Sequence, residues 1–342
     1  MLSLWVAAIL LFGYYVAQGV TSPVSKVPGP WYTRFTSLWI KYQEFTANRR
    51  ESVHRLHQVY GPVVRLGPNE VSFTSLDAIR EIYASGGSGY DKTEFYSLFK
   101  QLNTNPGGLK SLNVEKDFEI MEELTYHQSL QKSLLAYYLP SWEPYFPTFL
   151  HPRSAPKTNK FVLGMTAQSH VEEYTLVEKL RRKESGLELL QVAAECKDHM
   201  AAGIDTTGDG LCFLMWELSQ PQNLEFQRKL QHELRNTPPD SSLDSLVYLD
   251  AVIKEALRCS PPIPMSLPRY VPAGGRSIDG YFIPAHTIVS CQPYTVHRSC
   301  DEVFPEPDRF YPDRWLEDEG PAERNRHFFA FATGGRGCTG KK

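Results

Sequence analysis

The stretch that decides the fold is "FATGGRGCTG", Phe331 to Gly340, in which a single cysteine, Cys338, stands among four glycines. Glycines let the backbone come close to a flat or bulky partner, because no Cβ stands in the way. A cysteine in such a loop can be a metal ligand where nearby donors stabilise its thiolate. A lone cysteine is more commonly structural, so both interpretations stay open here. A phosphate-binding loop is disfavoured, because the stretch lacks the GxxxxGK[ST] pattern.

Composition limits the possible functions. The chain has 342 residues, 42% of them hydrophobic and 22% charged, enough to form one large core or two smaller ones. The net charge of −3 gives no basic field, so we expect no nucleic-acid partner. Six cysteines at irregular spacing, without a CxxC pair, argue against a disulfide framework or a zinc site.

A run without charged side chains, Leu2 to Val20, opens the chain. Its nineteen residues span about 28 Å as a helix, close to the hydrocarbon thickness of a bilayer. The first charged residue, Lys26, follows the run, and further cations after it favour a cytosolic domain. A cleaved signal peptide is the alternative, disfavoured because no Lys or Arg precedes the run. We therefore expect a transmembrane anchor over residues 1–21 and one domain over residues 22–342.

The middle of the chain predicts helices and a hairpin. The stretch 49–61 repeats apolar residues at helical spacing and ends in Gly61. The stretch 62–75 has two β-type runs around Gly67-Pro68-Asn69, which is typical of a hairpin. Three further helices are predicted over 185–221, 220–239 and 244–262, and the first is apolar enough to be buried. After Pro261 short β-type runs are broken by glycine and proline, so the fold class is mainly α with small β-sheets.

The predicted helix over 185–221 contains an unusual segment, "AGIDTTGDG", Ala202 to Gly210. Glycine costs about 1 kcal/mol in a helix interior, and threonine hydroxyls compete for backbone hydrogen bonds. Ala202 and Gly203 remove side-chain bulk, so a large group can lie against them. Asp205 and Thr206 place a carboxylate and a hydroxyl beside that space, which suits proton delivery. A helix crossing that needs small residues explains the segment equally well.

The predicted helix over 244–262 carries Glu255 and Arg258 three positions apart, on one turn. Taken alone, the pair is best interpreted as an exposed ion pair that contributes a few tenths of a kcal/mol.

The order of these elements resembles that of the cytochrome P450 haem-thiolate monooxygenases. The loop matches the family pattern FxxGxRxCxG at Phe331, Gly334, Arg336, Cys338 and Gly340. "AGIDTT" matches its [AG]Gx[DE]T[TS] element and "EALR" its ExxR element, and "PDRF" follows them in the family's order. "GYDKTEFYSLF", residues 89–99, is similar to filamentous-fungal members.

The resemblance implies a role for each matching residue. Cys338 would be the axial ligand of haem b, iron protoporphyrin IX, and Phe331 would pack beside it. The haem propionates would pair with Arg336 and Arg269, and the distal face of the haem would lie against Ala202 and Gly203. Protons would pass through Asp205 and Thr206. A buried structural triad would consist of Glu255, Arg258 and Arg309, and the substrate pocket would include Ile263, Pro264 and Met265.

The resemblance also implies a reaction and partners. The chain would insert one oxygen atom from O2 into an apolar small molecule, in fungal secondary metabolism. Electrons would come from NADPH through NADPH-cytochrome P450 reductase. The anchor would hold the chain in the endoplasmic reticulum membrane as a single-pass protein with a cytosolic catalytic domain.

Two stretches depart from the family pattern. After "YDKTEFYSLFKQLN", residues 90–103, the expected WxxxR or HxxxR helix is not found. After Gly340 only two lysines follow, where the family continues into a helix beneath the haem. We therefore expect an incomplete P450 fold. A shortened, catalytically inactive relative stays as the alternative to a working monooxygenase.

Overall fold

The computed structural model describes residues 13–14, 16–17, 19–84, 89–99, 123, 130–151, 156–168, 170–182 and 185–341. These residues form two compact units, 1–93 with 209–342 and 94–208. Most of the predicted anchor, residues 1–21, lies outside the described residues, as does the stretch after Gln101 where the WxxxR helix was sought. Within the described residues, no helix combines the length and the apolar character needed to cross a bilayer.

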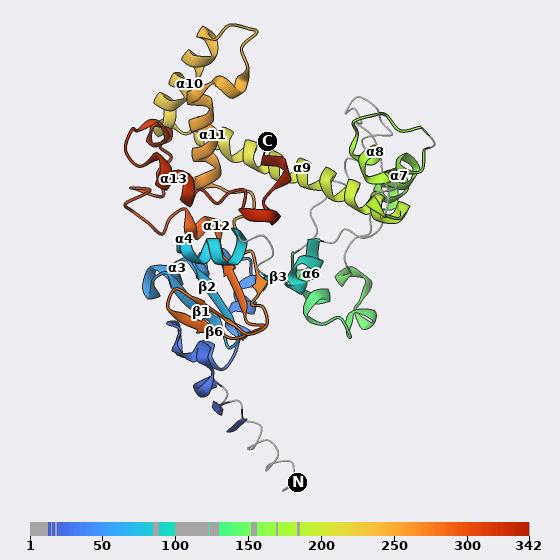
Figure 1. Cartoon of the computed structure of the whole chain (residues 1–342), viewed down its shortest axis with the longest axis vertical. Coiled ribbons are helices and arrows are strands. Elements are labelled where there is room, and N and C mark those ends of the chain that lie inside the picture. The colour runs from blue at the N-terminus through green and yellow to red at the C-terminus, as the bar shows by residue number, and fades with distance from the viewer. Residues whose placement is uncertain are drawn as a thin grey trace. The chain divides into compact units, whose positions relative to one another are not determined.

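The first unit combines two small sheets with helices, as predicted (Figure 1). A five-stranded sheet has the order β1-β2-β7-β4-β3, and β5 and β6 form a separate pair. Its strands are β1 (Val63–Gly67), β2 (Glu70–Phe73), β3 (Asp91–Lys92), β4 (Arg269–Tyr270), β5 (Arg276–Ile278), β6 (Tyr281–Ile283) and β7 (Ile288–Cys291). The α-helices of the first unit are α2 (Leu38–Phe45), α3 (Arg49–Tyr60), α4 (Leu76–Ile79), residues 209–219 of α9 (Leu189–Ser219), α10 (Leu224–Asn236), α11 (Val247–Cys259), α12 (Pro293–Val296) and α13 (Pro321–His327).

Short helical turns complete the first unit. They are η1 (Pro23–Lys26), η2 (Trp31–Arg34), the π-helix η3 (Arg80–Ala84), η8 (Pro221–Asn223), η9 (Leu243–Ser245), η10 (Pro312–Leu316), η11 (Gly334–Arg336) and η12 (Thr339–Lys341).

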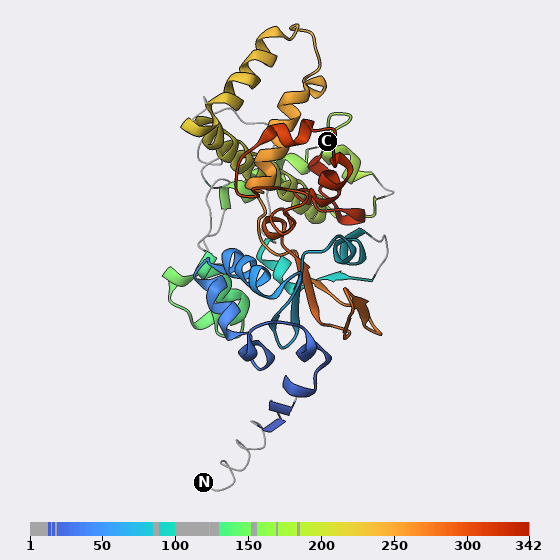
Figure 2. The same cartoon turned by 90° about the vertical axis from the view of Figure 1, so that its left-hand side faces the viewer.

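The predicted hairpin is confirmed, since β1 and β2 pair antiparallel, with Val63 opposite Phe73. The sheet continues through β7, which runs parallel to β2 and pairs Glu70 with Ile288, as the neighbouring blue and orange strands of Figure 2 show. This pairing joins residues more than two hundred positions apart. Alternating strand residues such as Val71, Phe73 and Val289 are fully buried in the main core, which explains the β-branched and aromatic composition of these runs.

The predicted helix at 49–61 is α3, which ends at Gly61 with a φ of 89° that favours glycine. One α3 side chain, His57, is 94% buried between the helix and the sheet. Its Nδ1–H donates to the carbonyl of Gly61 at 2.8 Å, and its Nε2 accepts from the Ser72 hydroxyl at 2.8 Å. Burial lowers the pKa of His57 to about 4, so this imidazole is neutral in the folded chain.

Acidification is expected to destabilise the fold through His57. The imidazole binds a proton in the unfolded chain below about pH 6.5 but in the folded chain only near pH 4. The contribution of this group to stability is therefore complete above pH 6.5 and falls by roughly 3 kcal/mol as the pH drops to 4. Urea unfolding at pH 7.5 and pH 4.5 measures the loss. This loss of unfolding free energy between the two pH values should be smaller in His57→Gln than in wild type. It should equal the wild-type value in His232→Gln, because the side chain of His232 is exposed.

The proline-rich stretch "VPGP" wraps around a buried arginine, Arg65 of β1, which is 1% exposed. Its guanidinium donates to the carbonyls of Ser25 at 3.0 Å and Pro30 at 3.2 Å, and also to that of Val27. Its Nε donates to the hydroxyl of Thr33 at 3.0 Å. Burial, and then the nearby charge of Arg34, lowers the pKa of Arg65 to about 10. Backbone carbonyls thus satisfy this cation and fix the path of residues 25–33 against the sheet.

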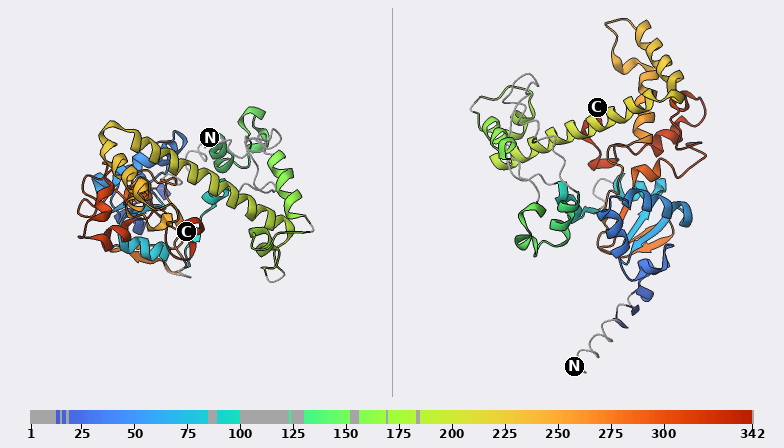
Figure 3. Two further views of the ribbon diagram at one scale, coloured as in Figure 1. Left: turned by 90° about the horizontal axis from the view of Figure 1, so that it is seen from above. Right: turned by 180° about the vertical axis from the view of Figure 1, so that it is seen from behind.

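The second unit is helical. It contains η4 (Glu94–Phe99), α6 (Leu130–Tyr138), η5 (Glu143–Tyr145), η6 (Thr148–Leu150), α7 (Pro156–Thr166), α8 (Leu176–Arg181) and the first part of α9 (Leu189–Ser219). Figure 3 shows α9 as one continuous helix, which agrees with the helix predicted over 185–221. The prediction that this helix is buried holds for residues of its first half such as Val192 and Ala193, and is wrong for its second half. Met215 and Trp216 are 70% and 56% exposed, because an apolar sequence is buried only where other elements cover it.

Candidate functional site

The candidate site begins with α11, which packs against α10 through Phe226, Tyr248 and Val252. The residue before α11, Leu246, does not cap the helix with its side chain. Instead Glu233 of α10 accepts hydrogen bonds from the amides of Tyr248 at 2.8 Å and Leu249 at 2.9 Å. These are orphan donors of the first turn, so a carboxylate from a neighbouring helix fixes where α11 starts.

Glu255 lies on the buried face of α11 and is fully enclosed. Both of its carboxylate oxygens bind Arg258, at 2.9 Å each. Arg314 donates to it at 3.1 Å, and the indole of Trp315 donates at 3.0 Å. The amide of Tyr311 adds a further bond at 2.9 Å. One buried carboxylate thus joins α11 to the residues of η10, so Glu255–Arg258 is not the exposed pair that spacing alone suggests.

The expectation that Arg309 is the third member of the buried triad is wrong. Its side chain is 54% exposed and pairs with Glu306 at 3.1 Å. Its carbonyl, and not its guanidinium, faces inward and accepts from Arg258 at 3.1 Å. Arg314, 3% exposed, binds Glu255 in its place. The sequence contains two similar stretches, "PDRF" at 307–310 and "PDRW" at 312–315, and only the second turns its arginine toward the core.

Geometry makes Arg258 the main partner of Glu255, because it binds both carboxylate oxygens whereas Arg314 binds one. Burial works against the charge of Arg258, yet hydrogen bonding and attraction from Glu255 raise its pKa. Burial lowers the pKa of Arg314 despite the attraction of the same carboxylate. Arg258 also donates to the carbonyl of Pro307 at 2.7 Å. The network therefore holds the segment after residue 304 against α11.

That segment leads to the loop Phe331–Gly340, which two backbone hydrogen bonds close. The amide of Cys338 donates to the carbonyl of Phe331 at 2.9 Å, and the amide of Gly337 donates to that of Gly334 at 3.0 Å. Phe331 is half-buried and meets Phe328 edge-on, with the ring centroids 6.1 Å apart. The Cys338 thiol is free and exposed.

Gly334 brings the backbone of this loop close to the backbone of η3. Its φ is 72°, and an added Cβ would lie 2.0 Å from the carbonyl oxygen of Tyr83 in η3. Gly335, its neighbour, has no atom of the described residues within 4 Å of an added Cβ. The loop thus needs glycine at 334 for close approach of two backbones, while the backbone at 335 faces open space.

The other predicted residues of the first unit lie in β4, η11 and the connection after α11. Arg269 is 5% exposed in β4, with its guanidinium 5.3 Å from the ring centre of Tyr83. The backbone of Arg336 ends η11, and its side chain lies outside the described residues. Ile263, Pro264 and Met265 are half-buried in the irregular connection between α11 and β4. The predicted roles of these residues stay predictions.

The predicted proton-delivery residues lie on α9 in the second unit. Ala202 and Gly203 are exposed, and Asp205 and Thr206 are half-buried. The hydroxyl of Thr206 donates to the carbonyl of Ala202 at 2.6 Å, one turn earlier. A threonine that bonds back to the helix in this way keeps its oxygen lone pairs free to accept another hydrogen bond.

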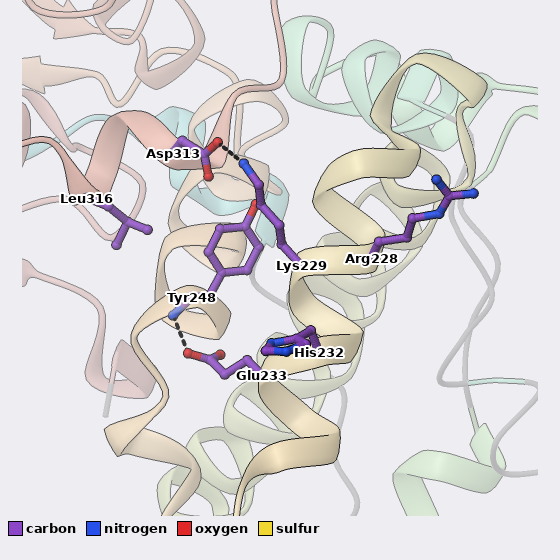
Figure 4. A pocket seen from close by; sticks show the side chains of 7 residues that line it. All are labelled: Arg228, Lys229, His232, Glu233, Tyr248, Asp313 and Leu316. Carbon is purple, nitrogen blue, oxygen red and sulfur yellow. Dashed lines mark hydrogen bonds and ion pairs between the residues drawn. The ribbon is translucent and has the colours of Figure 1, made fainter.

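A separate hollow of about 640 Å³ lies between α10, α11 and η10 (Figure 4). Lys229 on its wall pairs with Asp313 at 2.6 Å, and Glu233 caps α11. In Figure 4 the side chain of Arg228 points away from this pair. None of the predicted site residues lines the hollow, and the polar groups named here already serve the packing of helices.

The residues of the first unit fit a haem. The donor set is chemically suitable, because the exposed thiol of Cys338 stands on a closed glycine loop. The space beside Gly335 is free of other described atoms, so a flat group can approach the backbone there.

Sequence reasoning missed Arg314, Trp315 and the buried His297. The second Pro-Asp-Arg stretch was the available signal for Arg314, and its following tryptophan is a second donor to Glu255.

Comparison with known proteins supports the family resemblance seen in the sequence. Residues 162–342, just over half of the chain, match the family model described as "Cytochrome P450". A "Cytochrome P450 monooxygenase orf2" of Aspergillus niger is 27% identical over 416 residues, covering 95% of this chain and 84% of the relative. "Cytochrome P450 monooxygenase cpaH" of Aspergillus oryzae is 28% identical over 426 residues, covering 96% and 83%. "Cytochrome P450 monooxygenase poxC" of Penicillium oxalicum is 28% identical over 408 residues, covering 98% and 83%.

These alignments are longer than the chain itself, which has 342 residues. They therefore cross stretches that the relatives have and that this chain lacks. This finding agrees with the expectation that an internal stretch of the family fold is missing from the chain. The alignments do not show where in the chain that stretch is missing.

Proposed function

The chain belongs to the cytochrome P450 monooxygenase family, and from this premise we propose that it oxidises an apolar small molecule in fungal secondary metabolism. The observation that carries the proposal is the exposed Cys338 thiol on its closed glycine loop. The family implies haem, and this loop offers the thiolate that haem iron needs. The overall reaction is substrate plus O2, NADPH and a proton, giving hydroxylated substrate, water and NADP+.

Residues of the first unit hold the haem in this proposal. Cys338 would supply the thiolate ligand, and Arg336 and Arg269 would supply positive charge for the propionates. The buried carboxylate network of Glu255 keeps the segment that carries the loop in place. When bound, haem with a thiolate ligand supplies the activation of O2, and the protein supplies orientation and electrostatics.

Residues of α9 move the protons. The Thr206 hydroxyl donates to the carbonyl of Ala202, which orients its lone pairs and leaves them available to accept a proton donor. The carboxylate of Asp205, one residue earlier, can exchange protons with solvent. By the family resemblance, the small side chains of Ala202 and Gly203 would leave room for a porphyrin. Substrate contacts come from the apolar side chains of Ile263, Pro264 and Met265.

We also propose a membrane location and an electron donor. The charge-free run Leu2–Val20, followed by Lys26 and Arg34, favours a single-pass anchor in the endoplasmic reticulum. The anchor brings the chain to the same surface as a membrane-bound NADPH-cytochrome P450 reductase. Retention of the full chain in the membrane pellet after carbonate washing tests the anchor, and release into the supernatant would contradict it.

Cys338→Ala is expected to abolish the thiolate-haem spectrum, because no other residue of the loop can supply a thiolate. The measurement is the Soret band of the reduced, carbon monoxide-treated protein, at the wavelength from which the family takes its name. Cys212→Ala, which removes another exposed thiol, is the control and should keep the band. A band that survives in Cys338→Ala, or that is absent from haem-replete wild type, would contradict the proposal.

A second candidate is a shortened relative without turnover. Two observations favour it: the relatives align over more residues than the chain has, and apolar side chains of α9 such as Leu211 and Met215 are exposed. Haem content measured as the pyridine complex, together with substrate-independent NADPH consumption in the presence of reductase, separates the two. NADPH consumption above that of the reductase alone would contradict this second candidate, and a haem-replete chain without the thiolate band would support it.

A further inference from the structure

His297, at the C-terminal end of α12, is fully buried, and both ring nitrogens have partners. The amide of Phe329 donates to its Nε2 at 2.8 Å. Its Nδ1 lies 3.0 Å from the carbonyl oxygen of Arg258. An amide N–H can only donate and a carbonyl can only accept, so the imidazole proton is on Nδ1 and Nε2 is the acceptor. The side chain thus bridges α11 to the segment that precedes the Cys338 loop.

The bridge is continuous with the two features of the candidate site. On one side Arg258 donates to the carbonyl of His297 at 3.3 Å while its guanidinium binds Glu255. On the other side the imidazole stacks on Phe328, with ring centroids 5.8 Å apart and planes 12° from parallel. Phe328 meets Phe331 edge-on, and the Phe331 carbonyl accepts the amide of Cys338.

We propose that His297 is a positioning residue that couples the buried Glu255–Arg258 network to the Cys338 loop and sets where the thiol lies. The inference rests on the proposed haem-thiolate function, because the position of the thiol matters through the haem it binds. The side chain does not itself touch the thiol. It acts by holding the Phe329 amide, nine residues before Cys338, and by stacking on Phe328.

The charges around His297 agree with this role. Burial, and then the charge of Arg258, lowers the pKa of His297 to about 3. Arg298 and His327 also disfavour a second proton on the ring. The ring is therefore neutral in the folded chain near neutral pH, so Nε2 remains an acceptor for the Phe329 amide.

Two substitutions separate the two hydrogen bonds. The amide group of asparagine ends at the level of Nδ1, so His297→Asn keeps a donor for the Arg258 carbonyl but no acceptor for Phe329. Glutamine reaches the level of Nε2, so His297→Gln keeps the acceptor for Phe329. The bond to Phe329 carries the coupling to the loop, so glutamine should rescue what asparagine loses. A matched control is His57→Gln, which alters another buried neutral histidine with two hydrogen bonds, between α3 and β2.

The experiment compares two Soret bands in the full chain loaded with haem, reduced and treated with carbon monoxide. One belongs to thiolate-ligated haem, and the other, at shorter wavelength, belongs to haem that has lost the thiolate. The ratio of the first band to the second should fall by about five- to tenfold in His297→Asn, as the loss of one buried hydrogen bond predicts. It should stay within about twofold of wild type in His297→Gln and in His57→Gln.

A second readout needs no haem. Hydrogen exchange of the Phe329 amide should be faster in His297→Asn than in wild type and His297→Gln, because asparagine leaves that amide without an acceptor. Equal band ratios in the asparagine and glutamine variants, or unchanged exchange at Phe329 in His297→Asn, would overturn the proposal and leave His297 as a packing residue. If wild type lacks the thiolate band but the exchange of Phe329 behaves as expected, the proposed function fails while the bridge itself stands.

Discussion

Replacing Arg314 by methionine is expected to destabilise the fold by about 3–5 kcal/mol, whereas Arg309→Met should cost less than about 1 kcal/mol. Arg314 is buried, binds Glu255 at 3.1 Å and donates to the carbonyl of Pro305 at 2.8 Å. Its loss removes one of the two arginines that bind the buried Glu255 carboxylate and takes a donor from the Pro305 carbonyl. Both losses are costly, because water cannot replace the missing donor in the core. Arg309 is half in solvent, pairs with the exposed Glu306 and lies over the ring of Tyr311.

Urea unfolding of both variants beside wild type measures this difference. The two residues lie five positions apart in near-identical stretches, so each substitution serves as the control for the other. Equal destabilisation of the two variants, or a larger loss at Arg309, would contradict the observed triad. The Soret band should follow the same order, since the Glu255 network holds the segment that leads to the Cys338 loop.

These two arginines also illustrate what sequence could and could not predict. The helix α3 with its terminal Gly61, the hairpin β1–β2 and the helix α11 follow from periodicity and turn residues, which act over a few positions. Which of two Pro-Asp-Arg stretches turns its arginine inward depends on the path of the chain around Arg258, and that is a tertiary property. The ExxR spacing placed Glu255 and Arg258 on one turn but could not reveal that they are buried.

The same limit explains α9 and His297. The apolar composition of α9 predicted a helix correctly, yet burial depends on which elements cover it, and Met215 is 70% exposed. His297 had no distinguishing local pattern. Its partners, Arg258 and Phe329, lie 39 and 32 positions away in the sequence, so only the folded chain identifies it.

Gly334→Ala is the second substitution with a large expected effect. The new Cβ would lie 2.0 Å from the Tyr83 carbonyl oxygen and 2.8 Å from the Ala84 Cα, both backbone atoms. The φ of 72° adds strain of about 1–2 kcal/mol for any residue with a Cβ. We expect a total cost above about 3 kcal/mol, or a displaced loop and loss of the thiolate Soret band.

The segment around Tyr83 cannot easily move away from such a Cβ. Its hydroxyl donates to the carbonyl of Leu267 at 2.6 Å and accepts from the amide of Cys291 at 2.8 Å. Its ring also packs on Phe329, with centroids 5.3 Å apart. The loop, and not η3, should therefore shift, and with it Cys338.

Gly335→Ala is the matched control, because an added Cβ there meets no described atom within 4 Å. Its stability should stay within about 1 kcal/mol of wild type, and the thiolate band should remain. Thermal unfolding and the reduced carbon monoxide spectrum, recorded on both variants, decide the matter. If alanine is tolerated at 334 as well as at 335, the contact of the loop with η3 does not fix the position of the thiol. Loss of the band at 334 alone would instead tie the position of Cys338 to the Tyr83 backbone, which no pattern within the loop itself could predict.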